Sequence, residues 1–328
     1  MKKWLLSLLA LLSISVIVAC GKDTDSEKNS SENNNENTYT VDKVQTTYVQ
    51  SPLNVPSIVE KEKGFLSKSF EEEGIEFGYS NLTTGPEQTQ ALASGDIQFL
   101  NAVGATSVIL SASNGADIKI MSMYSRSPEA FMLFTNLDSI DSPKDLAGKK
   151  VAGPKGTILH ELLINYLATE GLTEKDIEFV QMDIPSAQAA LVAEEVDFAL
   201  LAGPTAYNMI QDGYQVVTNG EGLVDGTIVV ATSEDFYSKN RGLVKKFLQV
   251  QKETLNYIDE NYEEVMEITA KETDLPLDAV KEMYEMYDFN REITQSDIAS
   301  MEKTVDFMKE NNMIENDVDI ESLILDVE

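Results

Sequence analysis

The residues from Val151 to Leu172 combine a glycine-containing turn with the start of a helix, an arrangement that can bind an anion. A short apolar strand leads into the turn Gly153-Pro154-Lys155-Gly156, and Thr157 stands where a helix N-cap belongs. The apolar face of the expected helix consists of Leu159, Leu162, Leu163, Tyr166 and Leu167. Backbone N–H groups in the first turn of a helix have no partner inside the helix, and this end of its dipole is positive. The stretch predicts a cradle for a carboxylate or sulfonate, with an ordinary strand–turn–helix connection as the alternative.

The same arrangement recurs along the chain. The loops that end an expected strand and begin an expected helix are Ser51 to Asn54, Thr84 to Pro86, Gly104 to Thr106, Lys155 to Thr157 and Gly203 to Thr205. Ligands of open α/β sheets bind outside the carboxyl ends of the strands. Two halves built in this way and facing each other place several helix N-termini around one cleft.

The elements that position these loops alternate between strand and helix, which predicts parallel α/β sheets in two halves. The first half has expected strands at Val41–Gln50, Ile75–Leu82, Ile97–Val103 and Ile118–Tyr124. A second sheet is expected from Phe131–Thr135, Lys149–Ala152, Ile177–Met182, Val196–Leu201, Gln215–Thr218 and Thr227–Thr232. From Glu234 to Glu328 the pattern is almost wholly helical, with one long helix over Leu243–Lys271. We expect this tail to pack on a neighbouring lobe.

The first twenty residues have the pattern of an export signal. Lys2 and Lys3 precede an apolar run, Trp4 to Ala19, that is too short for a membrane-spanning helix. The run ends in Ile17-Val18-Ala19-Cys20-Gly21, which resembles the bacterial lipobox and implies cleavage before a lipid-carrying Cys20. A plain secretory signal with an incidental cysteine is the alternative. Residues 22 to 37 are almost all polar, so we expect a disordered, lipid-linked tether over residues 20–40.

Composition excludes several classes of function. The formal net charge is −31, so nucleic acid and anionic lipid surfaces are poor partners for the body. Acidic residues are scattered over helices such as Glu60 to Glu73, which indicates solvated faces rather than a metal site. Cys20 is the only cysteine and His160 the only histidine, so the body has no thiol and no histidine cluster. We expect no metal, no cofactor and no enzymatic activity.

Several runs, taken in order, resemble a known family. The matching residues are Ser51-Pro52-Leu53, Glu62-Lys63-Gly64-Phe65, Gly85-Pro86, Ala91-Leu92-Ala93-Ser94-Gly95-Asp96-Ile97, Gly104-Ala105, Asn114-Gly115-Ala116-Asp117, Ser142 to Ala152, Lys155-Gly156-Thr157 with His160 and Leu162-Leu163, and Gly171-Leu172-Thr173. They are similar to those of the extracytoplasmic solute-binding proteins of ABC importers in the sulfonate, taurine and nitrate group, which also covers thiamine-pyrimidine binders. The similarity spans about Val41 to Glu328.

This resemblance implies a two-lobed periplasmic-binding-protein fold of type II, with the ligand cleft between the lobes and a helical C-terminal segment. The implied organisation is a signal peptide over 1–19, the tether, a first lobe from 41–125 and 233–328, and a second lobe from 126–232. The family's site loops correspond here to Gln50, Ser51, Leu53, Thr84, Gly85, Gly104, Ala105, Thr106, Gly156, Thr157, His160, Gly203 and Thr205. Many relatives carry Trp-acid-Pro where this chain has Ala202-Gly203-Pro204, which reshapes that side of the pocket.

Two further side chains have two interpretations each. His160, in the first turn of its helix, either donates to a ligand oxyanion or pairs with a nearby backbone group. Arg126 follows the fourth expected strand, and its fork of N–H donors suits a sulfonate or carboxylate. A salt bridge at the hinge is the alternative for Arg126.

The leading hypothesis is a lipid-anchored, monomeric protein on the extracytoplasmic face of the cell membrane. It captures a small anionic solute, an aliphatic sulfonate or taurine-like compound, by lobe closure and delivers it to the transmembrane subunits of an ABC permease. The alternatives are a binder of a thiamine-pyrimidine precursor or nitrate-like solute, a pyrimidine-synthesis-type enzyme on the same scaffold, and a ligand sensor that signals to a receptor.

Overall fold

A computed structural model describes residues 39–49 and 52–327 of the chain. The expected signal peptide, Cys20, most of the expected tether, Gln50 and Ser51 lie outside the described residues. Contacts group Thr38–Glu328 into one unit, and the account below concerns that unit. None of its described helices has the length and apolarity that crossing a membrane requires.

The first lobe is built on five strands in which one strand runs against the other four. These strands are β1 (Lys43–Thr47), β2 (Glu76–Ser80), β3 (Leu100–Gly104), β4 (Lys119–Arg126) and β10 (Thr227–Thr232). Strands β1 and β2 pair in parallel, and a parallel bridge from Thr46 to Phe99 joins β1 to the segment that enters β3. Strand β10 lies between β3 and β4 and is antiparallel to both. The resulting order is β2-β1-β3-β10-β4.

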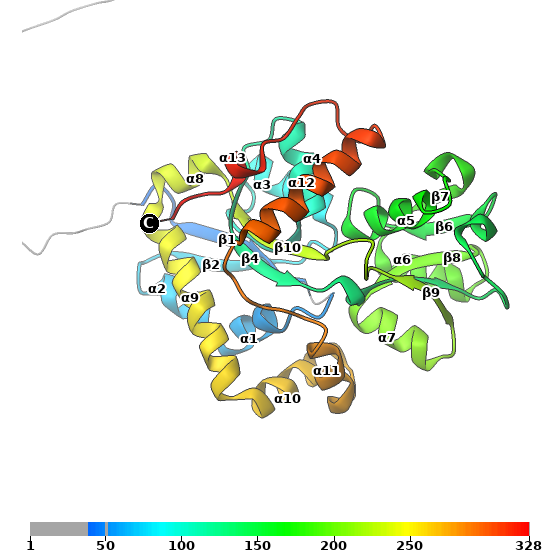
Figure 1. Cartoon of the computed structure of the whole chain (residues 1–328). Helices are drawn as coiled ribbons and strands as arrows, with labels where there is room; N and C mark the ends of the chain where they lie inside the picture. The colour runs from blue at the N-terminus through cyan, green and yellow to red at the C-terminus, as the bar shows by residue number, and fades with distance from the viewer. Residues whose placement is uncertain (1–38, 50–51, 328) are drawn as a thin grey trace, which may run out of the picture. The chain divides into compact units, whose positions relative to one another are not determined.

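The second lobe repeats this order (Figure 1). Its strands are β5 (Phe131–Thr135), β6 (Lys150–Gly153), β7 (Glu178–Gln181), β8 (Phe198–Ala202) and β9 (Gln215–Asn219). They are arranged β7-β6-β8-β5-β9, and β5 is antiparallel to both of its neighbours. In each lobe the antiparallel strand is the first strand that the chain enters after crossing from the other lobe.

The expectation that Thr227–Thr232 belongs to the second sheet is wrong. This strand, β10, pairs with β3 and β4 of the first lobe. All six of its residues are buried, and a short apolar run buried on both faces carries no signal about which sheet it joins.

Helices connect the strands and cover the sheets. In the two α/β halves they are α1 (Val55–Lys63), α2 (Phe65–Glu71), α3 (Gly85–Ser94), α4 (Ala105–Ser113), α5 (Ile158–Ala168), α6 (Ile184–Val192) and α7 (Gly203–Gln211), with 3-10 turns η1 (Pro128–Ala130), η2 (Pro143–Leu146) and η3 (Glu174–Asp176). The C-terminal segment contains α8 (Glu234–Lys239), α9 (Arg241–Glu260), α10 (Tyr262–Thr273), α11 (Leu277–Tyr284), α12 (Gln295–Glu310) and α13 (Ile320–Leu323). It packs on the first lobe, as expected: α9 and α10 lie against α1, and α12 lies against α4 and β10. The single long helix expected over Leu243–Lys271 is wrong, because the helix ends at Glu260 and Asn261 leaves the helical conformation (φ −130°, ψ 36°).

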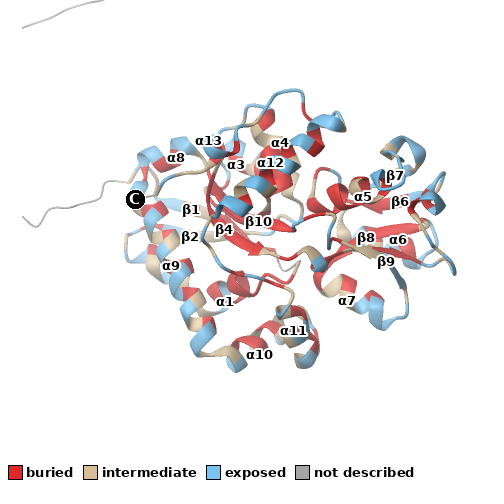
Figure 2. Cartoon of the chain, viewed as in Figure 1, coloured by how far each residue is buried: buried red, intermediate tan, exposed pale blue. Residues whose placement is uncertain are grey.

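One core of the first lobe lies between the sheet and the helices α1, α2 and α9, and another lies between the sheet and the helices α4 and α12. Phe99 and Phe247 are fully buried in the first of these cores, and their rings stack with centroids 4.1 Å apart. Figure 2 shows that buried residues follow the strands of both lobes, whereas the outer faces of helices such as α9 and α12 are exposed. The burial of apolar side chains is the main source of stability for an α/β lobe.

Two chain segments cross between the lobes and lie against each other. One joins β4 to β5, the other joins β9 to β10, and the Ser127 N–H donates to the Gly226 carbonyl at 3.3 Å. A Cβ atom on Gly226 would lie 2.6 Å from the Ser127 carbonyl carbon, so glycine permits this backbone approach. The paired crossings are the two covalent connections between the lobes.

Candidate functional site

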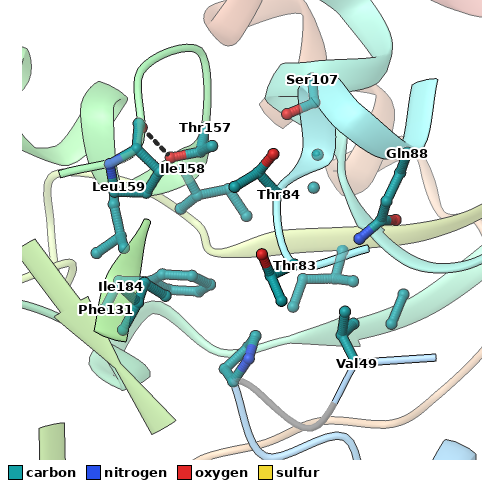
Figure 3. A pocket seen from close by; sticks show the side chains of 16 residues that line it. Val49, Thr83, Thr84, Gln88, Ser107, Phe131, Thr157, Ile158, Leu159 and Ile184 are labelled. Carbon is teal, nitrogen blue, oxygen red and sulfur yellow. Dashed lines mark hydrogen bonds between the residues drawn. The ribbon is translucent and has the colours of Figure 1, made fainter. Parts of the chain in front are cut away.

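A pocket opens between the two lobes at the carboxyl ends of their strands (Figure 3). Its volume is about 80 Å³. The lining residues are Val49, Pro52, Thr83, Thr84, Gly85, Gln88, Ala102, Gly104, Ser107, Phe131, Pro154, Thr157, Ile158, Leu159, Ile184 and Ile228. They come from both lobes, which is the arrangement that the repeated loops predict.

Helix N-termini surround this pocket, and they differ in whether a side chain caps them. At the start of α3, the Thr84 hydroxyl accepts the N–H of Glu87, and Glu87 completes a capping box. The N-cap residues of α4 and α5 are Gly104 and Thr157, and neither makes a side-chain cap bond. The first-turn N–H groups of α4 and α5 are therefore the donors best placed to bind an anion in the pocket.

The described lining residues carry no formal charge. Apart from hydroxyl groups and the amide of Gln88, the lining side chains are glycine, proline, aliphatic residues and Phe131. A buried anion is tolerated only when hydrogen bonds replace its hydration. In this pocket the backbone must supply most of those bonds, and the apolar side chains suit an alkyl group.

Hydrogen bonds join the lobes beside the pocket. The Ser107 hydroxyl of α4 donates to the Gly156 carbonyl of the second lobe at 2.8 Å. The Glu161 carboxylate on α5 accepts from Thr106 of α4 at 2.7 Å and from Thr304 of α12 at 2.9 Å. Burial raises the pKa of Glu161, and the two hydroxyl donors oppose that rise. These bonds tie the uncapped ends of α4 and α5 to each other's lobe.

His160 lies behind the pocket rather than in its lining. Its side chain is buried, its Nε2 lies 2.6 Å from Glu174 Oε2, and its Nδ1 accepts the Gly156 N–H at 3.5 Å. Burial lowers the pKa of His160, although Glu174 opposes that shift. A neutral ring that accepts at Nδ1 carries its proton at Nε2 and donates it to Glu174. This geometry corresponds to the second interpretation of His160, pairing with a nearby backbone group. The His160 ring holds the turn at Gly156 in place.

Arg126 is bound within the first lobe and is absent from the pocket lining. Its Nε and Nη2 donate to Asp297 at 2.6 and 2.7 Å, and its Nη1 donates to Asp288 at 3.2 Å. Further bonds reach the carbonyl groups of Asn290 and Glu292. This geometry corresponds to the salt-bridge interpretation, and it ties strand β4 to the first turn of α12 and to the segment before that helix.

The pocket lining includes four of the predicted ligand residues: Thr84, Gly85, Gly104 and Thr157. The other described residues among those predicted are absent from the lining: Leu53, Ala105, Thr106, Arg126, Gly156, His160, Gly203 and Thr205. Leu53 is buried, and its N–H donates to the Tyr287 hydroxyl at 2.9 Å. Contact of any of these residues with a ligand stays a prediction.

Other lining residues were not predicted from the sequence. Ser107 follows the loop Gly104 to Thr106 by one residue, so the turn geometry of α4 could have identified it. Ile184 begins α6 after the N-cap Asp183, which is also a recognisable helix start. Phe131 and Ile228 lie on strands next to the crossings and have no local sequence signal. Among the described residues, no group of three or more His, Cys, Asp or Glu side chains is placed to hold a metal ion.

Comparison with known proteins gives the family. The NMT1/THI5-like family model matches residues 52–265, which is more than half of the chain.

The chain belongs to the NMT1/THI5-like family.

Relatives with established or provisional names are binding proteins. The chain is 26% identical over 275 residues to a Bacillus subtilis protein provisionally named as an aliphatic sulfonates-binding protein, a match that covers 82% of each chain. It is 27% identical over 180 residues to the taurine-binding periplasmic protein of Escherichia coli, covering 54% of this chain and 55% of that one.

Solved structures show the fold. The alkanesulfonate-binding protein SsuA from Xanthomonas axonopodis pv. citri, bound to MOPS, has a TM-score of 0.78 at 20% identity, covering 87% of this chain and 98% of that chain. A Candida albicans protein described as having the generic periplasmic binding protein fold has a TM-score of 0.70 at 15% identity, covering 87% and 96%. The desulfurization enzyme DSZB has a TM-score of 0.64 at 16% identity, covering 86% and 96%. The chain therefore has the two-lobed periplasmic-binding-protein fold, which also occurs in an enzyme.

The ion pair of Arg126 predicts a pH-dependent stability. Burial raises the pKa of Asp297, but hydrogen bonds from Arg126 and Thr294 outweigh burial and lower the pKa to about 2. An acid with a lowered pKa contributes stability above its ordinary pKa, and this contribution is lost as pH falls towards the folded value. We expect Asp297→Asn to lower the free energy of unfolding at pH 7 by about 2 kcal/mol, measured by urea denaturation.

The difference between wild type and Asp297→Asn should shrink as the pH falls from 5 towards 3. Asp317→Asn is the control, because Asp317 pairs with Lys309 at an exposed site, where an ion pair contributes little, so the substitution should leave the free energy of unfolding almost unchanged. An Asp297→Asn difference that stays constant over this pH range would contradict the assignment.

Proposed function

We propose that the protein is the solute-binding component of an ABC importer and that its ligand is a small aliphatic sulfonate or taurine-like anion. The observation that carries the proposal is the pocket between the lobes, where α4 and α5 present uncapped N-termini to an uncharged lining. The binding of sulfonates or taurine by relatives supports the same solute class.

The chemistry of a sulfonate fits these donors. Its charge is shared by oxygens that each accept hydrogen bonds, and N–H groups at two helix ends approach from different directions. Its alkyl group would contact apolar side chains such as Phe131, Ile158 and Ile184. A nitrate-like ion uses the same donors but leaves the apolar surface without a partner, and a thiamine-pyrimidine precursor lacks the anionic group.

Lobe closure is the proposed means of capture. The lobes comprise residues 41–125 with 233–328 and residues 126–232, except that β10 joins the first sheet. Contacts made by a ligand to both lobes stabilise the closed state relative to the open one. The closed form would then deliver the solute to the transmembrane subunits of the permease, with the protein acting as a monomer.

An enzyme is the second candidate, because DSZB shares the fold. The described pocket lining contains no Cys, His, Asp, Glu or Lys, so it offers no pair of nucleophile and base. This favours binding over turnover. A sensor that presents its closed lobes to a receptor would use the same pocket. Binding to the transmembrane subunits of an ABC permease would distinguish an importer component from such a sensor.

The first experiment is a calorimetric titration of the purified body, residues 38–328, with ethanesulfonate, taurine, nitrate and a thiamine pyrimidine. We expect binding of a sulfonate compound and no consumption of it. Absence of heat with both ethanesulfonate and taurine would contradict the proposed solute class.

The backbone donors can be tested by removing one of them. Ala105 is the first residue of α4, a position where proline fits the helix but lacks the N–H group. We expect Ala105→Pro to weaken sulfonate binding by about tenfold or more, which corresponds to one lost bond to a charged group.

The matched control for this substitution is Gln295→Pro. Gln295 is the exposed first residue of α12. The Gln295→Pro substitution should leave the affinity for the sulfonate unchanged. Circular dichroism and the melting temperature check that both variants fold. Equal affinity in wild type and a folded Ala105→Pro variant would show that the N–H group of residue 105 does not bind the ligand.

The membrane anchor is a separate part of the proposal. We propose that Cys20 becomes the lipid-carrying N-terminus and holds the body at the extracytoplasmic face of the membrane. In a bacterial host the wild type should partition into detergent, and Cys20→Ala should appear in the aqueous phase. Wild-type protein found in the aqueous phase would contradict the anchor.

A further inference from the structure

Three glycines lie where one lobe touches the other beside the pocket, and each faces a residue of the opposite lobe. A Cβ atom on Gly104 would lie 3.2 Å from Ile158 Cδ1, and one on Gly156 would lie 3.0 Å from Leu110 Cδ2. A Cβ atom on Gly203 would lie 2.9 Å from Pro52 Cα. At Gly104 and Gly156 the facing side chain would have to shift by a few tenths of an ångström to admit a Cβ atom, and at Gly203 the facing backbone would have to move.

Of the three glycines, Gly203 is the one whose replacement by a larger residue the structure can accommodate least. Its neighbour across the gap is backbone, with Pro52 Cα and the Pro52 carbonyl carbon at 2.9 and 3.1 Å from the Cβ position. Backbone cannot rotate away as a side chain can, so any residue other than glycine would separate the start of α7 from the segment before α1. The Ala202-Gly203-Pro204 sequence is expected to reshape this side of the pocket. In the structure, backbone of the two lobes meets at Gly203.

Close approach of the lobes leaves a small pocket. A water molecule occupies about 30 Å³ in the liquid, so the volume of about 80 Å³ is roughly that of three water molecules. Pockets that bury a drug-sized ligand measure about 300–1,000 Å³, so this pocket suits the smallest sulfonates, methanesulfonate and ethanesulfonate, better than hexanesulfonate. Ile158, Phe131 and Ile184 close the apolar side, where a longer alkyl chain would have to extend.

We propose that the pocket selects short sulfonates, with one or two carbon atoms, and that Gly104, Gly156 and Gly203 set this limit by allowing the lobes to close tightly. This inference rests on the proposed function, because it names the size class of the same solute. A longer chain must either overpack the pocket or hold the lobes apart, and both lower its affinity.

The test compares the affinities of the purified body for methanesulfonate, ethanesulfonate and hexanesulfonate by calorimetry. In the wild type we expect hexanesulfonate to bind at least about tenfold more weakly than ethanesulfonate, because overpacking a closed pocket has a cost of this order. Equal affinities for ethanesulfonate and hexanesulfonate would overturn the size limit and leave the proposed function standing. Failure of all three and of taurine to bind would overturn the proposed function itself.

Gly203→Ala tests the role of the glycines, and Gly213→Ala is its matched control. Gly203 and Gly213 both have positive φ angles, +62° and +86°, but a Cβ atom on Gly213 has no atom within 4 Å. Both substitutions therefore strain the backbone, and only Gly203→Ala separates the lobes. We expect the ratio of the hexanesulfonate to the ethanesulfonate Kd to fall by about fivefold or more in Gly203→Ala and to stay unchanged in Gly213→Ala.

Ile158→Ala supplies a second variant in case Gly203→Ala fails to fold. It shortens the side chain that faces Gly104 and lines the pocket, so it should also lower the ratio. Melting temperatures establish which variants fold. A folded Gly203→Ala variant with the wild-type ratio would overturn the role of Gly203, and an unchanged ratio in Ile158→Ala would overturn the size limit.

Discussion

The cost of burying an anion without a countercharge governs this pocket. The described lining residues are uncharged, and Arg126, the cation that the sequence singled out, is bound to Asp297 and Asp288. A ligand that enters must exchange its hydration for hydrogen bonds from the protein. The first turns of α4 and α5 lack side-chain caps, and the proposed function assigns these bonds to their N–H groups, which add no charge to a chain whose net charge is −31.

The fold brings these helix ends together by repetition. Each lobe has four parallel strands with an antiparallel strand in the same place, and that strand adjoins a crossing between the lobes. The carboxyl ends of both sheets therefore face one gap. The bonds from Ser107 to Gly156 and from Thr106 to Glu161 fix α4 relative to α5, while His160 holds the turn at Gly156 from behind. Positioning is thus shared by Ser107, which lines the pocket, and by Thr106, Glu161 and His160, which are absent from the lining.

Much of this arrangement follows from local sequence, and the remainder depends on distant partners. Thr84, Gly104 and Thr157 were predictable because turn and cap chemistry involves only neighbouring residues. The partner of Arg126 was not, since Asp297 lies 171 residues away along the chain. The sheet that receives Thr227–Thr232 was wrongly predicted for the same reason. Phe131 and Ile228 line the pocket through tertiary packing alone, and whether any predicted residue touches a ligand stays a prediction.

A crystal structure of the body bound to ethanesulfonate tests the central claim most directly. The account predicts sulfonate oxygens within hydrogen-bond distance of first-turn N–H groups of both α4 and α5, with the Arg126–Asp297 pair intact. A sulfonate held by a lysine or arginine side chain, or bound outside the gap between the lobes, would contradict it.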